Sequence, residues 1–113
     1  MAKENKVFLQ HILDCIGKIE SYLQNADYAK FQTNLMMIDA VVRNVEVIGE
    51  AANYLTRDFR SGNPQIEWRK IIATRNRIIH GYATVDLEII WNITQSDLGN
   101  LKAEIEKILE KLS

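Results

Sequence analysis

The stretch LMMIDAVVRNVEVIGEAANYL, residues 35–55, decides the fold of this chain. Its apolar residues recur three and four positions apart, which is the spacing of one face of an α-helix rather than the alternation of a β-strand. The predicted buried stripe consists of Leu35, Ile38, Val41, Val42, Val45, Ile48, Ala52 and Leu55. We therefore expect a long helical segment that continues to about Phe59, with a break near Thr33.

The same spacing extends toward the amino end. A helix at about residues 4–24 would bury one apolar face, made up of Phe8, Ile12, Cys15, Ile16, Ile19 and Leu23. Asn25, Ala26 and Asp27 are typical turn residues, and we expect them to separate this helix from the next.

Toward the carboxyl end the clearest break is RSGNP, residues 60–64. Gly62 can end a helix, Asn63 can cap the following one, and Pro64 fits its first turn. The third helix would run to Gly81 with an apolar stripe of Trp68, Ile71, Ile72, Ile78 and Ile79. After a Gly-Tyr-Ala-Thr turn at residues 81–84 comes a fourth helix, from about Asp86, with a possible kink near residues 96–99. Its predicted buried residues are Ile89, Ile90, Ile93, Leu101, Ile105, Ile108 and Leu112.

This pattern predicts an all-α, up-and-down bundle of four or five helices, because long helices joined by short turns must lie antiparallel. A chain of 113 residues that is 47% hydrophobic can bury a core without a disulfide or a metal, so residues 1–113 should form a single domain. A helix of about 25 residues spans roughly 37 Å. Such a bundle offers a long flank for self-association, and we expect a homodimer.

Composition also indicates the compartment. The single cysteine, Cys15, lies within an apolar repeat and is best interpreted as a small core residue. No apolar run approaches the roughly 18 to 20 residues that span a bilayer, and the first residues lack the apolar stretch of a signal peptide. We expect a cytoplasmic protein without a membrane partner. No Cys/His spacing suggests zinc and no glycine-rich phosphate loop is present, so neither a metal nor a cofactor is expected.

The net charge of -1 hides a local asymmetry. Arg69, Lys70, Arg75 and Arg77 fall within residues 68–85, a stretch without any acidic residue. The rest of the chain has ten basic and fifteen acidic residues, a net charge of -5. Any surface that binds anions should therefore be local and should include this segment.

Arg75 stands out within it, because it lies at the centre of the apolar stripe of the third helix. A cation there is costly unless it is paired or faces a cleft. One interpretation is a structural ion pair with Glu46 or Glu50, and the other is a functional site, since perturbed charges mark such sites only in some proteins.

His80 lies five residues beyond Arg75, which on an ideal helix is about 140° round the axis. Asn76 lies four residues before His80, shares its face and can orient the imidazole. Arg75 reaches the same place only if the helix bends near Gly81, if its side chain curls back, or if a twofold axis brings two copies of the segment together. A satisfied core histidine is the simpler interpretation of His80, and Tyr82 could equally be a core aromatic.

The chemistry open to an arginine and a histidine is specific. RNA is cut without a metal when a base removes the 2′-hydroxyl proton, the oxygen attacks the adjacent phosphorus, and a cation stabilises the charge on the phosphate oxygens. Histidine titrates near neutrality, and the planar guanidinium donates two parallel hydrogen bonds. DNA lacks the attacking hydroxyl, so such a site would select RNA.

The segment RNRIIHGY, residues 75–82, resembles the R-x4-H-x-Y motif of the HEPN superfamily, and specifically the HepT-like toxins of HepT and MntA toxin-antitoxin pairs. Four further blocks resemble that family in their usual order: DAVVRN (39–44), IGEA (48–51), WRKII (68–72) and VDLEIIW (85–91). Gly81 is a departure, because relatives often have aspartate at that position, and it can alter the end of the helix.

This resemblance implies a HEPN-like homodimer with a composite cleft and metal-independent endoribonuclease activity. It implies that Arg75 and His80 are catalytic, that Asn76 assists, and that Glu50 is a polar neighbour of the site. A nucleotidyltransferase antitoxin similar to MntA would be the partner. It would add AMP to Tyr82 and so block the RNA cleft with bulk and negative charge, as expected of a type VII toxin-antitoxin system.

Two other functions stay open. In the first, the cleft binds a nucleotide without cutting RNA, or the chain is the accessory subunit of a nucleotidyltransferase. In the second, the chain is a purely structural dimer, and substitution of Arg75 would lower thermal stability without affecting any ligand.

Overall fold

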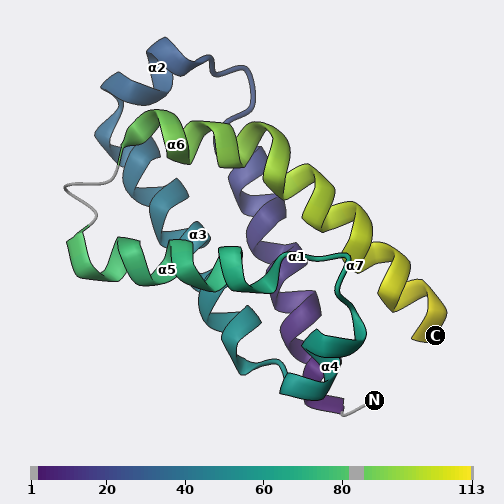
Figure 1. The fold of residues 1–113 in the computed structure, drawn as a ribbon. Helices are drawn as coiled ribbons and strands as arrows, with labels where there is room; N and C mark the ends of the chain where they lie inside the picture. The colour runs from purple at the N-terminus through teal and green to yellow at the C-terminus, as the bar shows by residue number, and fades with distance from the viewer. Residues whose placement is uncertain (1–2, 82–85, 113) are drawn as a thin grey trace.

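A computed structural model describes residues 3–81 and 86–112, with the backbone alone at positions 3 and 79–81. Within these ranges the chain is helical and forms no strand, so the predicted all-α class is confirmed (Figure 1). The elements in chain order are α1 (Lys3–Tyr22), α2 (Tyr28–Thr33), α3 (Leu35–Tyr54), α4 (Arg57–Gly62), α5 (Trp68–Gly81), α6 (Leu87–Asn92), η2 (Ile93–Asp97) and α7 (Leu98–Leu112). These segments outnumber the four or five predicted helices, because two of the predicted helices are interrupted.

Two capped turns lie between α1 and α3, as predicted. Asn25 adopts a φ of 63°, a left-handed conformation that asparagine tolerates better than most residues. The Asp27 carboxylate accepts a hydrogen bond from the Lys30 backbone N–H at 2.8 Å and caps α2. Asn34 caps α3 in the same way through the Met37 N–H, which places the predicted break beside Thr33.

Every predicted residue of the α3 stripe from Ile38 to Leu55 is buried, whereas the first residue of the stripe is exposed. Leu35 is 76% exposed and is the first residue after the Asn34 cap. The buried apolar residues of α1 are the predicted Ile12, Cys15, Ile16 and Ile19 together with Leu9. Phe8 and Leu23, which were also predicted to be buried, are half-buried, and Phe8 stacks on Tyr54 with 5.4 Å between ring centroids.

The prediction that the second helix continues to Phe59 is wrong. The chain leaves the helix at Leu55, and Thr56 starts α4 by accepting the Phe59 N–H with its hydroxyl. Asn5 of α1 holds this break in place. Its side chain is 2% exposed, donates to the Thr56 hydroxyl at 3.2 Å and accepts the Thr56 backbone N–H at 3.1 Å. A contact between residues so far apart in sequence left no local signal.

The predicted role of Asn63 is also wrong. It ends α4 instead of starting α5, because its side-chain amide donates to the Phe59 carbonyl at 2.9 Å. Pro64 therefore lies in the connection, and α5 begins at Trp68. The Trp68 indole N–H donates to the Asn63 carbonyl at 3.0 Å, and its ring lies 6.0 Å from that of Phe59. These contacts hold α4 against the start of α5.

The last predicted helix begins as expected, with Asp86 as the cap of α6. It contains a π-helical turn, η2, whose last two residues, Ser96 and Asp97, lie within the predicted kink near residues 96–99. The extra residue per turn in a π-helix shifts the apolar face. Ile90, Leu101, Ile105 and Ile108 are buried as predicted, whereas Ile89 and Leu112 are each 42% exposed and were wrongly assigned to the core.

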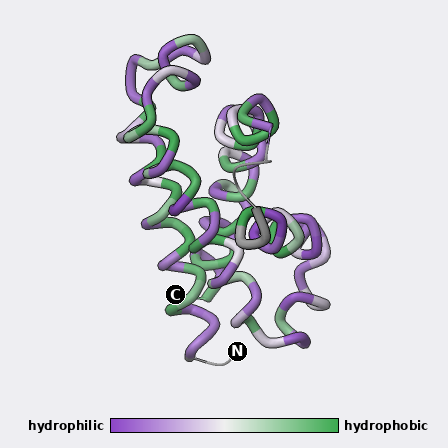
Figure 2. The backbone as a smooth tube through the Cα atoms, turned by 90° about the vertical axis from the view of Figure 1, so that its left-hand side faces the viewer, coloured by the Kyte–Doolittle hydropathy of each residue, from purple (hydrophilic) through white to green (hydrophobic). Residues whose placement is uncertain are grey.

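Helices α1 and α3 lie side by side and run in opposite directions, and α5 runs obliquely across α3 (Figure 1). The described chain measures 42 × 29 × 20 Å. Hydrophobic and hydrophilic residues alternate along each helix, as expected where one face is buried (Figure 2). Cys15 is buried as predicted, and burial raises the pKa of its thiol. Among the described residues, no helix is both long and apolar enough to cross a bilayer.

Candidate functional site

The centre of the candidate site is the crossing of α3 and α5 at Gly49 and Arg75. A Cβ atom added to Gly49 would lie 2.8 Å from Arg75 Cγ and 3.2 Å from the Ile71 carbonyl oxygen. Both distances are shorter than normal van der Waals contacts, so the two helices approach closely only because residue 49 has no side chain. The aliphatic part of Arg75 therefore packs directly on the backbone of α3.

Among the described residues, the guanidinium of Arg75 makes two polar contacts. Its Nη1 donates to Asn76 Oδ1 at 2.9 Å, and its Nη2 lies 3.9 Å from Glu50 Oε1. Its Nε is buried and, among the described residues, has no hydrogen-bond partner. Of the two predicted acidic partners Glu50 is confirmed, whereas Glu46 pairs with Arg43 at 3.4 Å.

The ion pair with Glu50 is weak. Its 3.9 Å separation exceeds hydrogen-bond distance, and the two side chains are 27% and 34% exposed. A pair of this kind orients the guanidinium without satisfying its donors. Arg75 therefore keeps the capacity to bind an anion.

The side chain of Arg75 curls toward Asn76, which lies on the neighbouring face of α5. Position 80 follows Asn76 by one helical turn within the same helix. Three ways in which Arg75 could approach His80 follow from the sequence, and a side chain that folds back along the helix is one of them. The side chain of His80, the burial of Ile79 and all of Tyr82 lie outside the described residues, as does most of the predicted turn at 81–84. The roles of His80, Asn76 and Tyr82 therefore stay predictions.

An open pocket of about 550 Å³ lies along the face of α5 that carries Asn76. We call it the arginine pocket, because Arg57, Arg60 and Arg69 line it, together with Asn53, Ser61 and Asn76. No carboxylate is among the described residues that line it. Sequence reasoning found Arg69 but missed both arginines of α4. Arg57 and Arg60 are three residues apart, which places them on one face of a helix. This spacing went unused in the prediction, because the prediction had one continuous helix up to Phe59 and not the separate helix α4 that lies beside α5.

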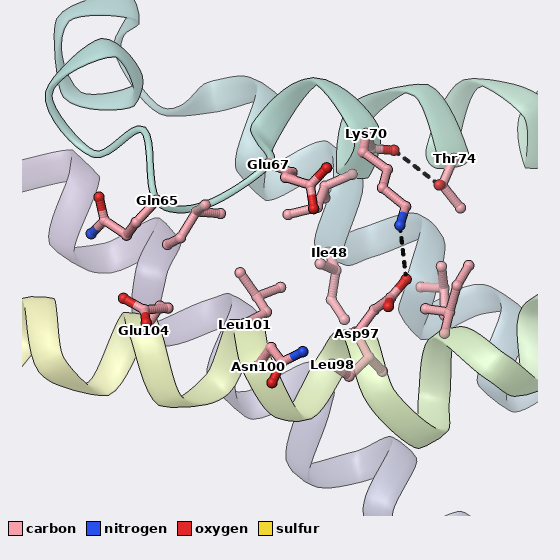
Figure 3. Close-up of a pocket in the computed structure, with 14 residues that line it drawn as sticks. Ile48, Gln65, Glu67, Lys70, Thr74, Asp97, Leu98, Asn100, Leu101 and Glu104 are labelled. Carbon is pink, nitrogen blue, oxygen red and sulfur yellow. Dashed lines mark hydrogen bonds and ion pairs between the residues drawn. The ribbon is translucent and has the colours of Figure 1, made fainter.

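A second pocket, of about 120 Å³, lies on the opposite side of α5 (Figure 3). Its apolar lining includes Ile48, Ile71 and Leu101, and three carboxylates border it, from Glu67, Asp97 and Glu104. Three negative charges against the single ammonium of Lys70 make this pocket unfavourable for a phosphate.

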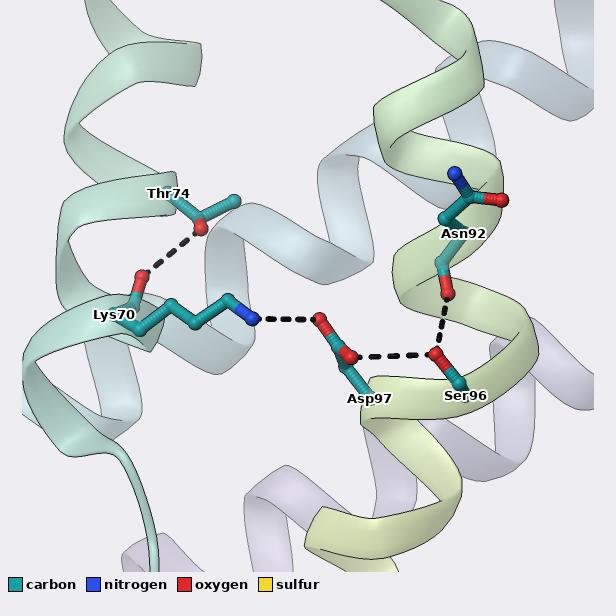
Figure 4. A network of polar contacts seen from close by, with 5 residues as sticks. All are labelled: Lys70, Thr74, Asn92, Ser96 and Asp97. Carbon is teal, nitrogen blue, oxygen red and sulfur yellow. Dashed lines mark hydrogen bonds and ion pairs between the residues drawn. The ribbon is translucent and has the colours of Figure 1, made fainter.

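Lys70, which belongs to the predicted basic segment, has a structural role in this second pocket. Its ammonium lies 3.4 Å from Asp97 Oδ2 and so connects α5 to η2 (Figure 4). The Ser96 hydroxyl lies within hydrogen-bond distance of both Asp97 Oδ1, at 3.3 Å, and the Asn92 carbonyl, at 3.1 Å. Helix α5 thus separates a basic side from an acidic one, and the basic side includes Asn76, which accepts the hydrogen bond from Arg75. Across residues 3–81 and 86–112, no three His, Cys, Asp or Glu side chains are grouped so that they could share a metal ion.

Comparison with known proteins agrees with the motif. The family described as "Ribonuclease HepT-like" matches residues 12–108. A protein of Methanocaldococcus jannaschii named "Putative RNase" is 35% identical over 104 residues, which cover 92% of this chain and 95% of the relative. A "Probable ribonuclease HepT" of Thermococcus cleftensis is 32% identical over 108 residues, which cover 96% of this chain and 98% of the relative.

A longer relative carries a similar region beside another activity. It is named "Gamma-glutamylcyclotransferase and putative RNase", comes from Methanocaldococcus jannaschii, and is 38% identical over 112 residues. These cover 99% of this chain but only 50% of the relative, so the chain spans about half of that protein. No solved structure gives a significant match. The family match and the extent of the similarity to these relatives together show that the chain belongs to the HepT-like ribonuclease family.

Proposed function

We propose that the chain is a metal-independent endoribonuclease and the toxin of a type VII HEPN/MNT toxin-antitoxin pair, and that it acts as a cytoplasmic homodimer. The observation that supports this most directly is the state of Arg75. Its aliphatic chain packs on Gly49, its guanidinium group donates to Asn76, and its buried Nε has no hydrogen-bond partner among the described residues. A cation held in this way is preorganised for a phosphate.

In the proposed reaction, His80 removes the proton of the 2′-hydroxyl, and the 2′-oxygen attacks the adjacent phosphorus. The bond from phosphorus to the 5′-oxygen breaks, and that oxygen takes a proton from water as it leaves, while the protonated imidazole returns its proton to the solvent. The products are a 2′,3′-cyclic phosphate and a 5′-hydroxyl end. Arg75 donates to the non-bridging oxygens, where negative charge grows, while Glu50 and Asn76 keep the guanidinium in place. A second copy of the same segment would complete the cleft.

The first prediction concerns cleavage without metal. The purified protein should cut single-stranded RNA at an undiminished rate in the presence of EDTA, and the fragments should carry 2′,3′-cyclic phosphate ends detectable by mass spectrometry. A 2′-O-methyl copy of the same RNA should stay intact, because it has no free hydroxyl to attack. Tight nucleotide binding without any RNA cleavage would instead support the accessory-subunit function.

The second prediction concerns silencing by the proposed antitoxin. An MntA-like nucleotidyltransferase would join the Tyr82 oxygen to the α-phosphorus of ATP and release pyrophosphate. With the transferase and ATP, the protein should gain the mass of one or more AMP groups and lose RNA cleavage. Tyr82→Phe should gain no AMP and should keep cutting RNA.

Tyr54→Phe is the matched control, since Tyr54 is 68% exposed and lies on α3. The Tyr54→Phe variant should gain AMP and lose RNA cleavage to the same extent as the protein without substitutions. Modification of Tyr82→Phe to the same extent would show that the acceptor is a different residue.

A further inference from the structure

We propose that the arginine pocket binds the phosphates of single-stranded RNA beside the bond to be cut, through Arg57, Arg60 and Arg69. This inference rests on the proposed function and names the part of the protein that positions the substrate. None of the three arginines takes part in the proposed bond cleavage. They would act as positioning residues that hold the strand in register.

The first argument is the way the fold presents the two arginines of α4. Thr56 and Asn63 cap the two ends of this short helix, and Phe59 is buried between them against Trp68. With Phe59 turned inward, Arg57 and Arg60 line the pocket on the side of α5 that carries Arg69. Three arginines from two helices thus line one pocket.

The second argument is that these charges lack counter-charges. Within residues 3–81 and 86–112, Arg57, Arg60 and Arg69 form no ion pair, and no carboxylate lines the pocket. The Nε of Arg60 is buried without a hydrogen-bond partner among the described residues. Three cations around one pocket repel each other, and an unsatisfied buried N–H is costly. A bound phosphate group relieves the repulsion between the three cations, and the planar fork of arginine suits its oxygens.

The third argument is continuity with the catalytic residues. Asn76 lines the pocket and also accepts the hydrogen bond from Arg75, so the pocket and the candidate site share a residue. Along α5, positions 69 and 76 are about 10 Å apart and position 80 lies about 6 Å further, at 1.5 Å per residue. A strand whose scissile phosphate lies at Arg75 would therefore place neighbouring phosphates over the arginine pocket.

Among its described lining residues, the pocket has no accessible aromatic face on which a base could stack. Trp68, the aromatic residue among them, is 6% exposed, and its indole N–H donates to the Asn63 carbonyl. Base recognition on single strands usually needs an accessible aromatic face. We therefore infer that the pocket follows the phosphate backbone and contributes affinity without sequence preference.

The experiment measures binding to a 12-nucleotide 2′-O-methyl RNA by fluorescence anisotropy over a range of salt concentrations. This probe cannot be cleaved by the proposed reaction, so binding is measured apart from catalysis. The variant Arg57→Ala/Arg60→Ala/Arg69→Ala should bind roughly 10- to 100-fold more weakly at low salt, and the slope of log K against log salt should become less steep by about 2, as expected when three phosphate contacts to a single strand are lost. The variant Arg57→Lys/Arg60→Lys/Arg69→Lys keeps the three positive charges, so its slope of log K against log salt should stay close to that of the protein without substitutions.

The matched control removes three cations elsewhere, as Lys6→Ala/Lys18→Ala/Lys30→Ala. These three lysines are exposed and lie on α1 and α2, away from the pocket. The control changes the net charge by the same amount and should bind within about twofold of the unmodified sequence, so that net charge alone is excluded as the cause. Circular dichroism establishes that each variant is folded.

Equal RNA affinity for the alanine variant and the control would overturn the inference. So would loss of binding to an acidic protein partner by the alanine variant while its RNA affinity is kept, since the pocket would then be a protein-binding site. The proposed function fails separately. If the unmodified protein never cuts RNA but the alanine variant loses affinity for the probe, the pocket stands as an RNA site and the catalytic proposal falls.

Discussion

Arg75→Ala is expected to lower the single-turnover rate constant for RNA cleavage about 10²- to 10³-fold, because the phosphate loses a preorganised donor where charge accumulates. His80→Ala should lower it about 10²- to 10⁴-fold through loss of proton transfer. Single-turnover assays in EDTA, with protein in excess of a labelled RNA, measure both. Arg75→Lys should recover only part of the rate, because an ammonium keeps the charge but not the fork.

Arg77→Ala is the matched control for this pair, since Arg77 is an exposed arginine on the same helix. It should cut RNA within a fewfold of the unmodified rate. If Arg75 has only a structural role, Arg75→Ala should instead lower the melting temperature and leave the rate of RNA cleavage unchanged. That result, or full activity in His80→Ala, would remove these residues from the catalytic assignment.

Gly49→Ala is expected to be the most damaging small substitution in the described core. The added methyl group would overlap the side chain of Arg75 and press on the Ile71 carbonyl, so α5 must move away from α3. Overpacking of this kind costs about 1 to 3 kcal/mol. For a domain of about 100 residues this lowers the melting temperature by roughly 5 to 15 °C. Displacement of Arg75 should reduce RNA cleavage in the same variant.

Gly17→Ala supplies a control of opposite sign. Gly17 lies within α1, and a Cβ atom there would meet nothing within 4 Å. Alanine should stabilise this helix by about 0.5 to 1 kcal/mol relative to glycine. Thermal unfolding followed by circular dichroism compares the two variants. If Gly49→Ala melts at or above the temperature of Gly17→Ala, the close crossing of α3 and α5 is not a constraint on the fold.

Apolar spacing was sufficient to predict the helical class and most of the buried face of α3. It failed where the choice between neighbouring residues depends on packing. Ile89 and Ile90 are equally apolar, and only the path of α6 against the core decides that Ile90 is buried. Leu35 fits the stripe but is exposed at the first position of α3, and periodicity carries no information about which end of a helix is covered by its neighbours.

The candidate site divides in the same way. Arg75 could be singled out because a cation interrupts an apolar stripe. Glu50 could be named only together with Glu46, because both lie on a polar row of the second predicted helix, and the structure decides between them. The arrangement of Arg57 and Arg60 could not be predicted, because it depends on the break at Leu55, which a distant asparagine maintains. Glycine at position 49 looked like any helical glycine until the crossing with α5 was visible.

The clamp between Asn5 and Thr56 has a practical consequence for the amino end of the protein. Deleting the first turn of α1 would free the Thr56 amide to exchange its hydrogen with solvent and would remove the two hydrogen bonds by which the buried Asn5 side chain holds the start of α4. Shortened versions that begin after this asparagine should be more sensitive to proteases between α3 and α5.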